Sequence, residues 1–396
     1  MTTTDATSDL GYDPYDHELA RDPWATFARL REEAPLLYNE EHDFWALSRA
    51  EDIEKAHVDR ETFINRRGDT LSVLKRGVEV PPGTVIFEDP PTHAIHRALL
   101  SRMFTPRRVL ELEPRIRELC TSLVEPLADA KEFDFMADIG RQLPMLVIST
   151  LVGIPESDQE LIRDHYLASK EREVEDRGDN LSGAIFAKYV DERAANPAGD
   201  IMSTLLHSEF QDFDGVTRTL SREEVLAYVN IVAAAGNDTT AILIGWMAKV
   251  LAEHPDQRRL LVEDPSLIGN AVDELARFEP PPLQSCRYVA RDIELHGQIV
   301  PEGSIMALLI ASANRDTDRY DDPDRFDVRR DLRQYYTFGF GAHFCLGQAL
   351  AKLEMRVLLE ELLPRIPEWD VDLDRAVFGH KDPDLRPWHT MPAVVG

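Results

Sequence analysis

One cysteine stands in a glycine-rich segment, where it could act as a metal ligand or as a nucleophile. The segment FGFGAHFCLG covers residues 338–347 and places Cys345 directly before a predicted helix over about 346–363. Because the N-terminus of a helix stabilises an anion, a thiolate is favoured at this position. Backbone amides that follow the cysteine can hydrogen-bond the sulfur and tune it as a metal ligand.

The residues alone leave two other interpretations of Cys345 open. A lone cysteine is most often a buried structural thiol. A cysteine nucleophile needs a neighbouring base, and the sequence does not identify one. The glycines permit tight turns and a close approach of the backbone to a flat ligand.

The segment resembles the haem-binding loop of the cytochrome P450 family, FxxGxxxCxG, at every fixed position, including Phe338 and Gly341. The resemblance implies haem b as the cofactor, with Cys345 as the axial thiolate to its iron, and O2 as a co-substrate. Thiolate donation favours cleavage of the O–O bond. His343 matches a position that usually contacts a haem propionate.

A second motif, E-x-x-R, stands on a predicted helix over residues 267–278 that three prolines follow. Residues three apart share a helix face, so Glu274 and Arg277 can pair. Such pairs are abundant on surfaces, but in this context the motif resembles the family's buried structural ion pair. Arg325 matches the third partner. The resemblance assigns these residues to folding and to holding the cysteine loop.

The long predicted helix in the middle of the chain carries a polar run, AGNDTT, at residues 235–240. From the residues alone, the run could be a local kink with satisfied hydroxyls. It resembles the family's oxygen-activation motif, A-G-x-[DE]-T-T. The resemblance implies that Gly236 helps to open the helix beside the iron, with Ala235 over the haem. Thr239 would hydrogen-bond the dioxygen or its water, and Asp238 would relay protons from solvent.

A third motif, DPPTHAIHR at residues 89–97, resembles the family's D-P-P-x-H-x-x-x-R segment. His93 and Arg97 are four residues apart and share a helix face. Both suit a haem propionate, Arg97 through its forked guanidinium. Arg287 begins an R-x-x-x-x-D pattern that matches the family's other propionate contact. His96 is expected to be a helix-surface residue.

The composition places the chain among ordinary soluble globular proteins. It has 396 residues, of which 43% are hydrophobic and 29% charged. The formal net charge of −28, from 44 Lys and Arg against 72 Asp and Glu, argues against a general nucleic-acid or anionic-membrane binder. The three cysteines stand far apart, which speaks against a disulfide framework and against a structural zinc site.

The sequence favours a cytoplasmic protein without a membrane anchor. The N-terminus has no basic region followed by an apolar one, so no signal peptide is expected. The best candidate for a membrane span is residues 231–248, but the polar residues at its centre are costly in lipid. A buried helix with a polar site in the middle is the better interpretation.

The chain is predicted to be mainly helical. A capping box at Ser221 begins a helical pattern of roughly 33 residues, about 50 Å long at 1.5 Å per residue. The pattern is apolar on nearly every face, so this helix should pass through a core. Strand signals are short, at residues 44–47 and 287–310, and residues 64–91 are expected to be a long loop.

These elements and the resemblance predict a mainly α protein with small β-sheets and the cytochrome P450 fold. Residues 1–12 are expected to be a flexible tail. No linker rich in Pro, Gly or Ser divides the remaining chain. Residues 13–396 are therefore predicted to form a single large helical domain around a buried haem.

A run of arginines without an acid between them follows His93 in this acidic chain: Arg97, Arg102, Arg107 and Arg108. The run can be a fluctuation among solvated charges. It also fits a basic docking patch for an acidic ferredoxin, because complementary charge would accelerate association and make it salt-sensitive. Lys352 and Arg356 could extend this patch.

By analogy with the family, four segments line the distal pocket: the loop before His93, the first half of the long helix, the stretch after the prolines and the C-terminal loop. The lining residues expected there are Val85, Ile86, Phe87, Val232, Leu283, Gln284 and Phe378. Because this set is mostly apolar, it suits a lipophilic substrate such as a fatty acid, branched lipid, terpenoid or steroid.

We therefore expect a haem-thiolate monooxygenase that hydroxylates a lipophilic small molecule, with electrons from a separate ferredoxin and reductase. One alternative is a haem-thiolate peroxygenase or isomerase that needs no electron donor. Another is a non-catalytic, haem-based binder of hydrophobic ligands. The presence of both Asp238 and Thr239 favours the monooxygenase, because the binder needs no proton relay.

Overall fold

The computed structural model of the protein describes residues 10–77, 84–159, 161–162, 181–379 and 383–396. The chain forms two compact units, each assembled from segments that are far apart in the sequence. Unit 1 comprises residues 1–80, 273–345 and 378–389, and unit 2 comprises residues 81–272, 346–377 and 390–396. The motifs found in the sequence are divided between these units.

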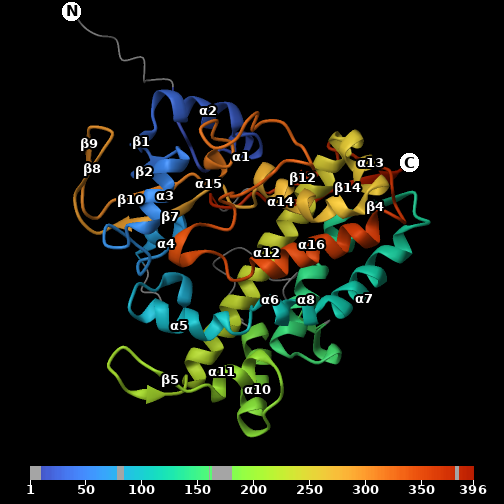
Figure 1. Cartoon of the computed structure of the whole chain (residues 1–396), viewed down its shortest axis with the longest axis horizontal. Helices are drawn as coiled ribbons and strands as arrows, with labels where there is room; N and C mark the ends of the chain where they lie inside the picture. The colour runs from blue at the N-terminus through green and yellow to red at the C-terminus, as the bar shows by residue number, and fades with distance from the viewer. Residues whose placement is uncertain (1–9, 78–83, 160, 163–180, 380–382) are drawn as a thin grey trace, which may run out of the picture. The chain divides into compact units, whose positions relative to one another are not determined.

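Unit 1 is built on a five-stranded sheet of order β1-β2-β10-β7-β3 (Figure 1). The strands are β1 (Leu36–Asn39), β2 (Phe44–Leu47), β3 (Phe63–Ile64), β7 (Ser285–Val289) and β10 (Ile305–Leu308). Strands β2 and β10 run parallel, with Met306 opposite Trp45, and the other neighbouring pairs are antiparallel. The central strand β10 is buried over Met306, Ala307 and Leu308, as a strand covered on both faces should be.

Unit 1 also contains short helices: α1 (His17–Arg21), α2 (Trp24–Glu33), α3 (Ala50–Val58), α4 (Leu71–Arg76), α15 (Ile310–Ala313) and the 3-10 helix η6 (Gly341–His343). Helix α4 packs against β7 and β10, and α15 packs against α2 and α3. Strands β8 (Ile293–Leu295) and β9 (Gln298–Val300) form a hairpin. One apolar core joins the N-terminal segment, through Leu47 and Ile53, to Val289, Met306 and Tyr336. Unit 1 therefore ties the segment before the cysteine loop to the beginning of the chain.

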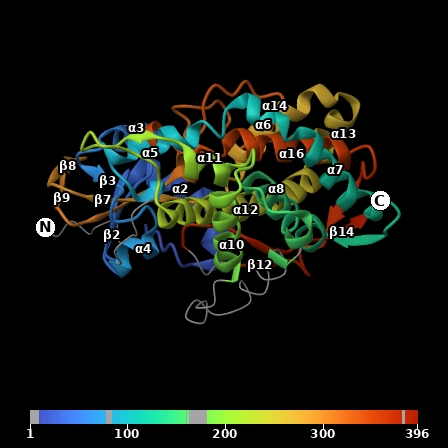
Figure 2. The ribbon, with the colours of Figure 1, turned by 90° about the horizontal axis from the view of Figure 1, so that it is seen from below.

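Unit 2 is organised around helix α12 (Arg222–Glu253). Its first turn is closed by the predicted capping box, since Ser221 Oγ accepts from the N–H of Glu224, and the Glu224 carboxylate accepts from the N–H of Ser221. The helix packs against α8 (Leu143–Val152), the π-helix η3 (Phe135–Gly140) and α10 (Leu181–Ala195) (Figures 1 and 2). The predicted passage of this helix through a core is confirmed.

The other helices of unit 2 include α5 (Thr92–Ser101), α6 (Pro106–Glu111), α7 (Glu113–Val124), α11 (Ile201–His207), α13 (Pro255–Glu263) and α16 (Gln348–Leu362). Helix α14 (Ile268–Phe278) begins in unit 2 and ends in unit 1. A three-stranded sheet of order β11-β14-β4 is formed by β4 (Glu132–Asp134), β11 (Trp369–Val371) and β14 (Pro392–Val395). Strands β5 (Phe210–Gln211) and β6 (Thr217–Arg218) form a hairpin before α12.

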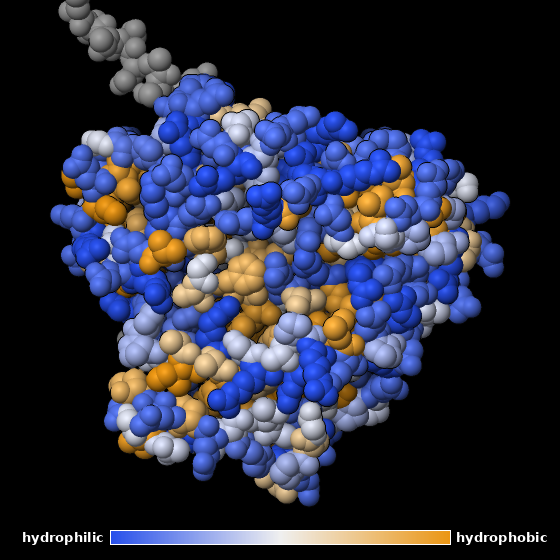
Figure 3. Space-filling model, in the orientation of Figure 1, coloured by the Kyte–Doolittle hydropathy of each residue, from blue (hydrophilic) through white to orange (hydrophobic). Residues whose placement is uncertain are grey.

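Two helical stretches, Phe135–Val152 and Arg222–Glu253, are long and apolar enough to cross a membrane. In each, 61% of the apolar window is buried inside the protein. The core helix of a soluble protein meets the same criterion, so these stretches are weak evidence for a span. The face of the molecule in Figure 3 is mostly hydrophilic with smaller apolar patches, in keeping with the net charge of −28.

The predicted fold class, mainly α with small β-sheets, is confirmed, but two local expectations were wrong. The flexible tail does not extend to residue 12, because Leu10 and Tyr12 are buried and Tyr12 donates a hydrogen bond to Gln284 at 2.9 Å. The predicted loop over residues 64–91 contains α4, which Thr70 caps. Residues 1–9 and 78–83 lie outside the described part of the chain.

Candidate functional site

Cys345 lies at the end of a tight loop in unit 1. Gly339 and Gly341 have φ values of +75° and +72°, which glycine adopts without strain. The N–H of Cys345 donates to the carbonyl of Phe338 at 2.8 Å, so the backbone folds back on itself. Cys345 is exposed at this turn, and the next helix, α16, begins at Gln348.

The cysteine loop is anchored by Asn314, which is fully buried. The side-chain oxygen of Asn314 accepts from the N–H of Tyr336 at 2.7 Å, and its Nδ2 donates to Thr337 Oγ1 at 2.8 Å. Thr337 in turn donates to the carbonyl of Ala276 on α14 at 2.6 Å. The start of the loop is therefore held against α14 by one amide side chain.

The ion pair predicted from the E-x-x-R motif is present on α14. Arg277 donates to Glu274 through Nε at 2.7 Å and Nη2 at 2.8 Å, and both side chains are fully buried. The Nη1 of Arg277 donates to the carbonyl of Asn314 at 2.9 Å. Because the Asn314 side chain holds the loop, Asn314 connects the ion pair to the cysteine segment.

The predicted third partner of this pair, Arg325, was wrong. The Arg325 side chain is 63% exposed, and only its carbonyl faces Arg277, at 3.5 Å. Arg330 takes the position instead, since its Nε donates to Glu274 Oε1 at 3.0 Å. The Arg330 guanidinium also donates hydrogen bonds to three backbone carbonyls of the preceding turn. The backbone therefore folds around Arg330, and the Arg325 side chain is left in solvent.

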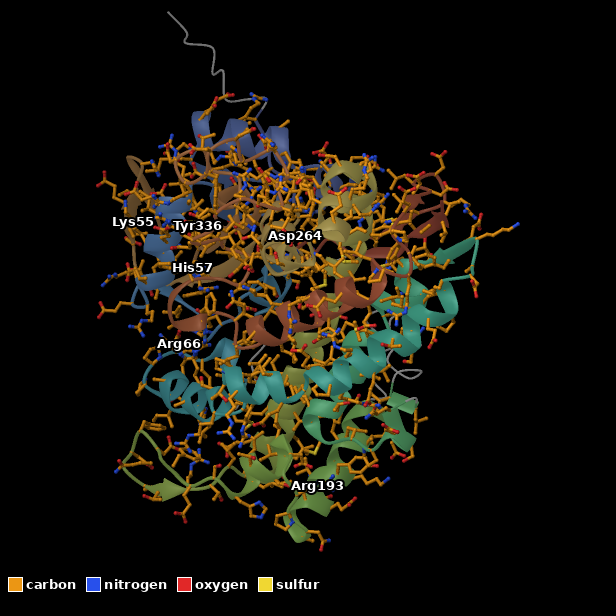
Figure 4. All side chains as sticks on the ribbon, turned by 45° about the vertical axis from the view of Figure 1, so that its right-hand side comes forward. Lys55, His57, Arg66, Arg193, Asp264 and Tyr336 are labelled. Carbon is orange, nitrogen blue, oxygen red and sulfur yellow. The ribbon has the colours of Figure 1, made fainter. Side chains whose placement is uncertain are left out.

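A buried arginine and a buried histidine lie beside the cysteine loop. Arg287 on β7 donates through Nη1 to Ser285 Oγ and to the carbonyl of Cys286, both at 2.7 Å, and through Nη2 to Nδ1 of His57 at 3.2 Å. His57 stands in the last turn of α3 (Figure 4), and its carbonyl would lie 3.2 Å from a Cβ placed on Gly341. Burial, together with the charge of Arg287, lowers the pKa of His57 well below 6.5.

Helix α5 in unit 2 carries His93 and Arg97, as the motif predicts, with His93 buried and Arg97 partly exposed. The expectation that His96 lies on the helix surface was wrong. His96 is buried, its Nδ1 is 2.9 Å from both carboxylate oxygens of Glu88, and its ring meets Tyr228 edge-on. The reason is tertiary, since this face of α5 packs under α12 within unit 2.

The polar run of α12 lies within one continuous helix, Arg222–Glu253, with no break at Gly236. A Cβ on Gly236 would come within 2.5 Å of Ile148 on α8, so this glycine permits close packing of the two helices. Thr239 Oγ1 donates to the carbonyl of Ala235 at 2.9 Å, and Asp238 is partly exposed. Ala234 and Ala235, the residues just before Gly236, are exposed small side chains on this helix.

The expected pocket residues are divided between the units: Val85, Ile86, Phe87 and Val232 in unit 2, and Leu283, Gln284 and Phe378 in unit 1. The first three form the 3-10 helix η1 (Val85–Phe87). The amide of Gln284 is engaged by the protein, because it donates to Asp384 at 3.0 Å and accepts from Tyr12. Phe378 packs edge-on against Trp388.

The arginines of the expected docking patch have different environments. Arg102 and Arg108 are exposed, whereas Arg107 pairs with a glutamate one turn later. The expected extension to Arg356 was wrong. Its guanidinium donates to Glu113 at 2.6 Å and to Glu360 at 2.8 Å, and these carboxylates also hold Arg117. Its charge is neutralised within the packing of α16 on α7.

Comparison with known proteins decides between the interpretations of the cysteine loop. A family model described as Cytochrome P450 matches residues 162–366. The chain is 36% identical to cytochrome P450 123 of Mycobacterium tuberculosis over 405 residues, which cover 100% of this chain and 99% of that protein. The chain belongs to the cytochrome P450 family.

This P450 is also 35% identical to the vitamin D(3) 25-hydroxylase of Pseudonocardia autotrophica, over 100% of this chain and 98% of that protein. The solved structure of CYP109Q5 from Chondromyces apiculatus matches it with a TM-score of 0.88 at 32% identity, over 98% of both chains.

P450s are monooxygenases that use haem b with a cysteine thiolate as axial ligand and O2 as co-substrate, and they bind a substrate and a redox partner. The residues of this chain fit such a group. The loop presents Cys345 at an exposed turn, and the exposed residues Ala234 and Ala235 on α12 have only small side chains. The buried Nε2 of His57 has no hydrogen-bond partner among the residues described, as expected of a donor that faces an anionic group.

Three residues of this region escaped the sequence analysis: His57, Asn314 and Arg330. No motif contains His57 or Asn314, and each acts on segments more than 20 residues away in the sequence. For Arg330 a signal existed, because several arginines follow the Asp-Pro turn, but spacing alone did not distinguish it from Arg325.

Proposed function

We propose that this P450 hydroxylates a lipophilic small molecule of the fatty acid, branched lipid, terpenoid or steroid class. The observation that carries the proposal is the presence of two exposed alanines on α12, Ala234 and Ala235, about one helical turn before Asp238 and Thr239. A relative 35% identical over the whole chain is named a vitamin D(3) 25-hydroxylase. CYP109E1 of Bacillus megaterium, solved in complex with testosterone, is 25% identical with a TM-score of 0.83. Both names support a substrate with a large apolar skeleton.

In this proposal Cys345 is the axial ligand, and the haem, when bound, activates O2 for insertion of one oxygen atom into a C–H bond. The N-terminus of α16 begins three residues after the cysteine, and the positive end of a helix dipole favours an anion nearby. Phe338 and Gly341 shape the turn, and Ala235 leaves room for the porphyrin. The test is the absorbance spectrum of the reduced, carbon monoxide-bound protein. A strongly red-shifted Soret band is expected, and its loss in Cys345→Ala but not in Cys120→Ala would support the assignment.

Asp238 and Thr239 are proposed to deliver protons. The hydroxyl of Thr239 donates to the carbonyl of Ala235, so its oxygen keeps lone pairs that can accept from a water or an acid. Asp238 is partly exposed and can exchange protons with solvent. An acid next to an alcohol can thus pass a proton inward without opening the helix.

The proposed contacts of the haem propionates are His93 and Arg97 on α5, Arg287 on β7 and His343 in η6. Arg287 supports this role best, because its guanidinium is buried and already oriented by Ser285 and the carbonyl of Cys286. A buried cation is favoured when a carboxylate faces it.

The proposed substrate contacts are Val85, Ile86, Phe87, Val232, Leu283, Gln284 and Phe378. The aliphatic and aromatic members are favoured, since the Gln284 amide is already satisfied by Tyr12 and Asp384. We expect lipophilic ligands from the four classes to shift the haem spectrum from low to high spin, and the ligand that shifts it most to be converted to a hydroxylated product.

A separate acidic ferredoxin and its reductase are proposed as electron donors, with docking at Arg102 and Arg108. We also propose that residues 13–396 act as one catalytic domain, because relatives match this chain over nearly their whole length. We propose a cytoplasmic location, because no signal peptide is expected from the sequence. Turnover that needs only peroxide would instead support a peroxygenase. Tight binding without product under any donor would support a haem-based binder.

A further inference from the structure

His57 is a buried polar residue that neither the sequence motifs nor the proposed reaction employs. It stands in the last turn of α3 with 7% of its surface exposed. Its backbone lies against the cysteine loop, since a Cβ on Gly341 would meet the His57 carbonyl at 3.2 Å. A side chain with no function at this depth would more often be apolar.

The contact with Arg287 determines the tautomer of His57. A guanidinium has donors and no acceptor, so Nη2 of Arg287 must donate to Nδ1 of His57, 3.2 Å away. Nδ1 therefore carries the lone pair, and in the neutral ring the proton is on Nε2. The low pKa of His57, which burial and the charge of Arg287 cause, is consistent with the neutral ring.

The N–H at Nε2 consequently needs an acceptor. Among the residues that the structure describes, none accepts a hydrogen bond from this atom. A buried donor without a partner is rare in folded proteins and destabilises them. An acceptor other than the described residues would satisfy this N–H, and it must tolerate the neighbouring cation of Arg287. A carboxylate meets both conditions.

We propose that His57 binds a propionate carboxylate of the haem through Nε2–H, with its tautomer held by Arg287. The proposal rests on the assignment of Arg287 as a propionate contact in the proposed function. His57 is thus a cofactor-binding residue contributed by α3, and it extends the propionate site of unit 1 beyond Arg287 and His343.

Haem release tests this proposal independently of turnover. The holoprotein is mixed with excess apomyoglobin, and the rate of haem transfer is followed by absorbance. Loss of a hydrogen bond to a charged acceptor should speed release by roughly tenfold to a hundredfold in His57→Phe. His57→Asn should act similarly, because its amide can accept from Arg287 but is too short to reach the carboxylate. In His57→Gln, which can place an N–H near the Nε2 position, release should stay within a few-fold of the wild type.

The cofactor supplies a second control. Each protein is reconstituted with iron protoporphyrin IX dimethyl ester, whose propionates are neutral esters. The difference between wild type and His57→Asn should then largely disappear. His296→Asn is a matched control in unit 1, because His296 hydrogen-bonds Asp52 at the surface and asparagine tolerates the φ of +47° at this position. This variant should release haem at the wild-type rate.

Three outcomes would overturn the proposal. The first is haem release from both His57→Phe and His57→Asn at the wild-type rate, and the second is that His57→Asn accelerates release by the same factor with the dimethyl ester as with haem. The third is that His57→Gln releases haem as fast as His57→Asn. Arg287→Leu separates this failure from that of the proposed function. If Arg287→Leu accelerates release only with the free propionates while the His57 variants do not, the Arg287 assignment stands and the His57 proposal is wrong. If neither residue affects release, both assignments are wrong.

Discussion

At the scale of single residues, the hydrogen bond of the Thr239 hydroxyl determines whether this group can donate or accept. The Oγ1 of Thr239 donates to the carbonyl of Ala235 at 2.9 Å, as threonine commonly does within a helix. Its proton is therefore directed at the backbone, and its oxygen remains an acceptor. A water can donate to that oxygen, and Asp238 in its protonated form can supply a proton to such a water, which is the arrangement a controlled proton path needs.

We predict that Thr239→Ala keeps haem and thiolate ligation but raises the share of electrons that end as hydrogen peroxide severalfold. The measurement is the ratio of peroxide and hydroxylated product to NADPH consumed, with a surrogate ferredoxin system. Thr150→Ala is the control, because Thr150 makes the same bond to the carbonyl four residues back, on α8. Unchanged coupling in Thr239→Ala would remove this residue from the path.

Glu354 is a second residue whose environment has a measurable effect. It is buried in α16, and no described residue hydrogen-bonds its Oε2. Burial raises its pKa well above 4.5, so the folded protein holds the proton where the unfolded chain releases it. The contribution of this carboxyl to stability is therefore complete below about pH 4.5 and is lost as pH rises towards the folded-state pKa.

We predict that Glu354→Gln removes this loss. Between about pH 5 and the folded-state pKa, the free energy of unfolding of the wild type should fall relative to the variant by up to about 1.4 kcal/mol per pH unit. Urea denaturation at several pH values measures the difference. Glu223→Gln, at the exposed start of α12, is the control. Parallel pH profiles for wild type and Glu354→Gln would contradict the prediction.

At the scale of elements, α14 connects the ion pair to the cysteine loop. Its Glu274 and Arg277 form a bidentate pair, Arg277 donates to the carbonyl of Asn314, and the Asn314 side chain holds residues 336 and 337. Arg330 completes the set from the turn that follows Asp322. The position of Cys345 thus depends on contacts made by a helix that ends more than 60 residues earlier.

We predict that Arg330→Leu and Arg325→Leu differ sharply. Removing Arg330 leaves the buried Glu274 with less compensation and should reduce the free energy of unfolding by roughly 3–5 kcal/mol. Removing the exposed Arg325 should change it by about 0.5 kcal/mol or less. Urea denaturation of both variants measures this, and equal effects would contradict the assignment of the third partner.

For the whole molecule, the dominant property is its net charge of −28. Against that background, Arg102 and Arg108 on unit 2 are exposed, whereas Arg107 and Arg356 are paired with glutamates. An acidic protein is repelled by the chain as a whole, so an exposed cationic patch can strongly bias where it docks.

We predict that Arg102→Gln with Arg108→Gln slows reduction by an acidic [2Fe–2S] ferredoxin roughly tenfold at low ionic strength. The difference should shrink at high salt, because the interaction is screened over about a Debye length. Stopped-flow reduction under carbon monoxide measures the rate. The double variant Arg60→Gln with Arg76→Gln, which changes the net charge equally, is the control. Equal slowing in both double variants would mean that net charge alone is responsible.

The local elements of this P450 can be predicted from the sequence alone. Helix α12 is marked by its capping box and its apolar run, and α14 by its period and the prolines that follow. The cysteine loop is marked by glycines that need positive φ angles. Each of these features depends on residues within one or two turns of each other, so the sequence contains the whole of the physical cause.

Contacts between residues far apart in the chain are determined by the tertiary packing. The choice of Arg330 over Arg325, the burial of His96 and Tyr12, and the contact of Gly236 with Ile148 each depend on which face meets a distant segment. His57 and Arg287 are 230 residues apart and meet only because α3 and β7 share a core. Periodicity predicts which face of an element is buried, but not which distant side chain packs against that face. The packing free energy that selects one partner over another arises only when the unit is assembled.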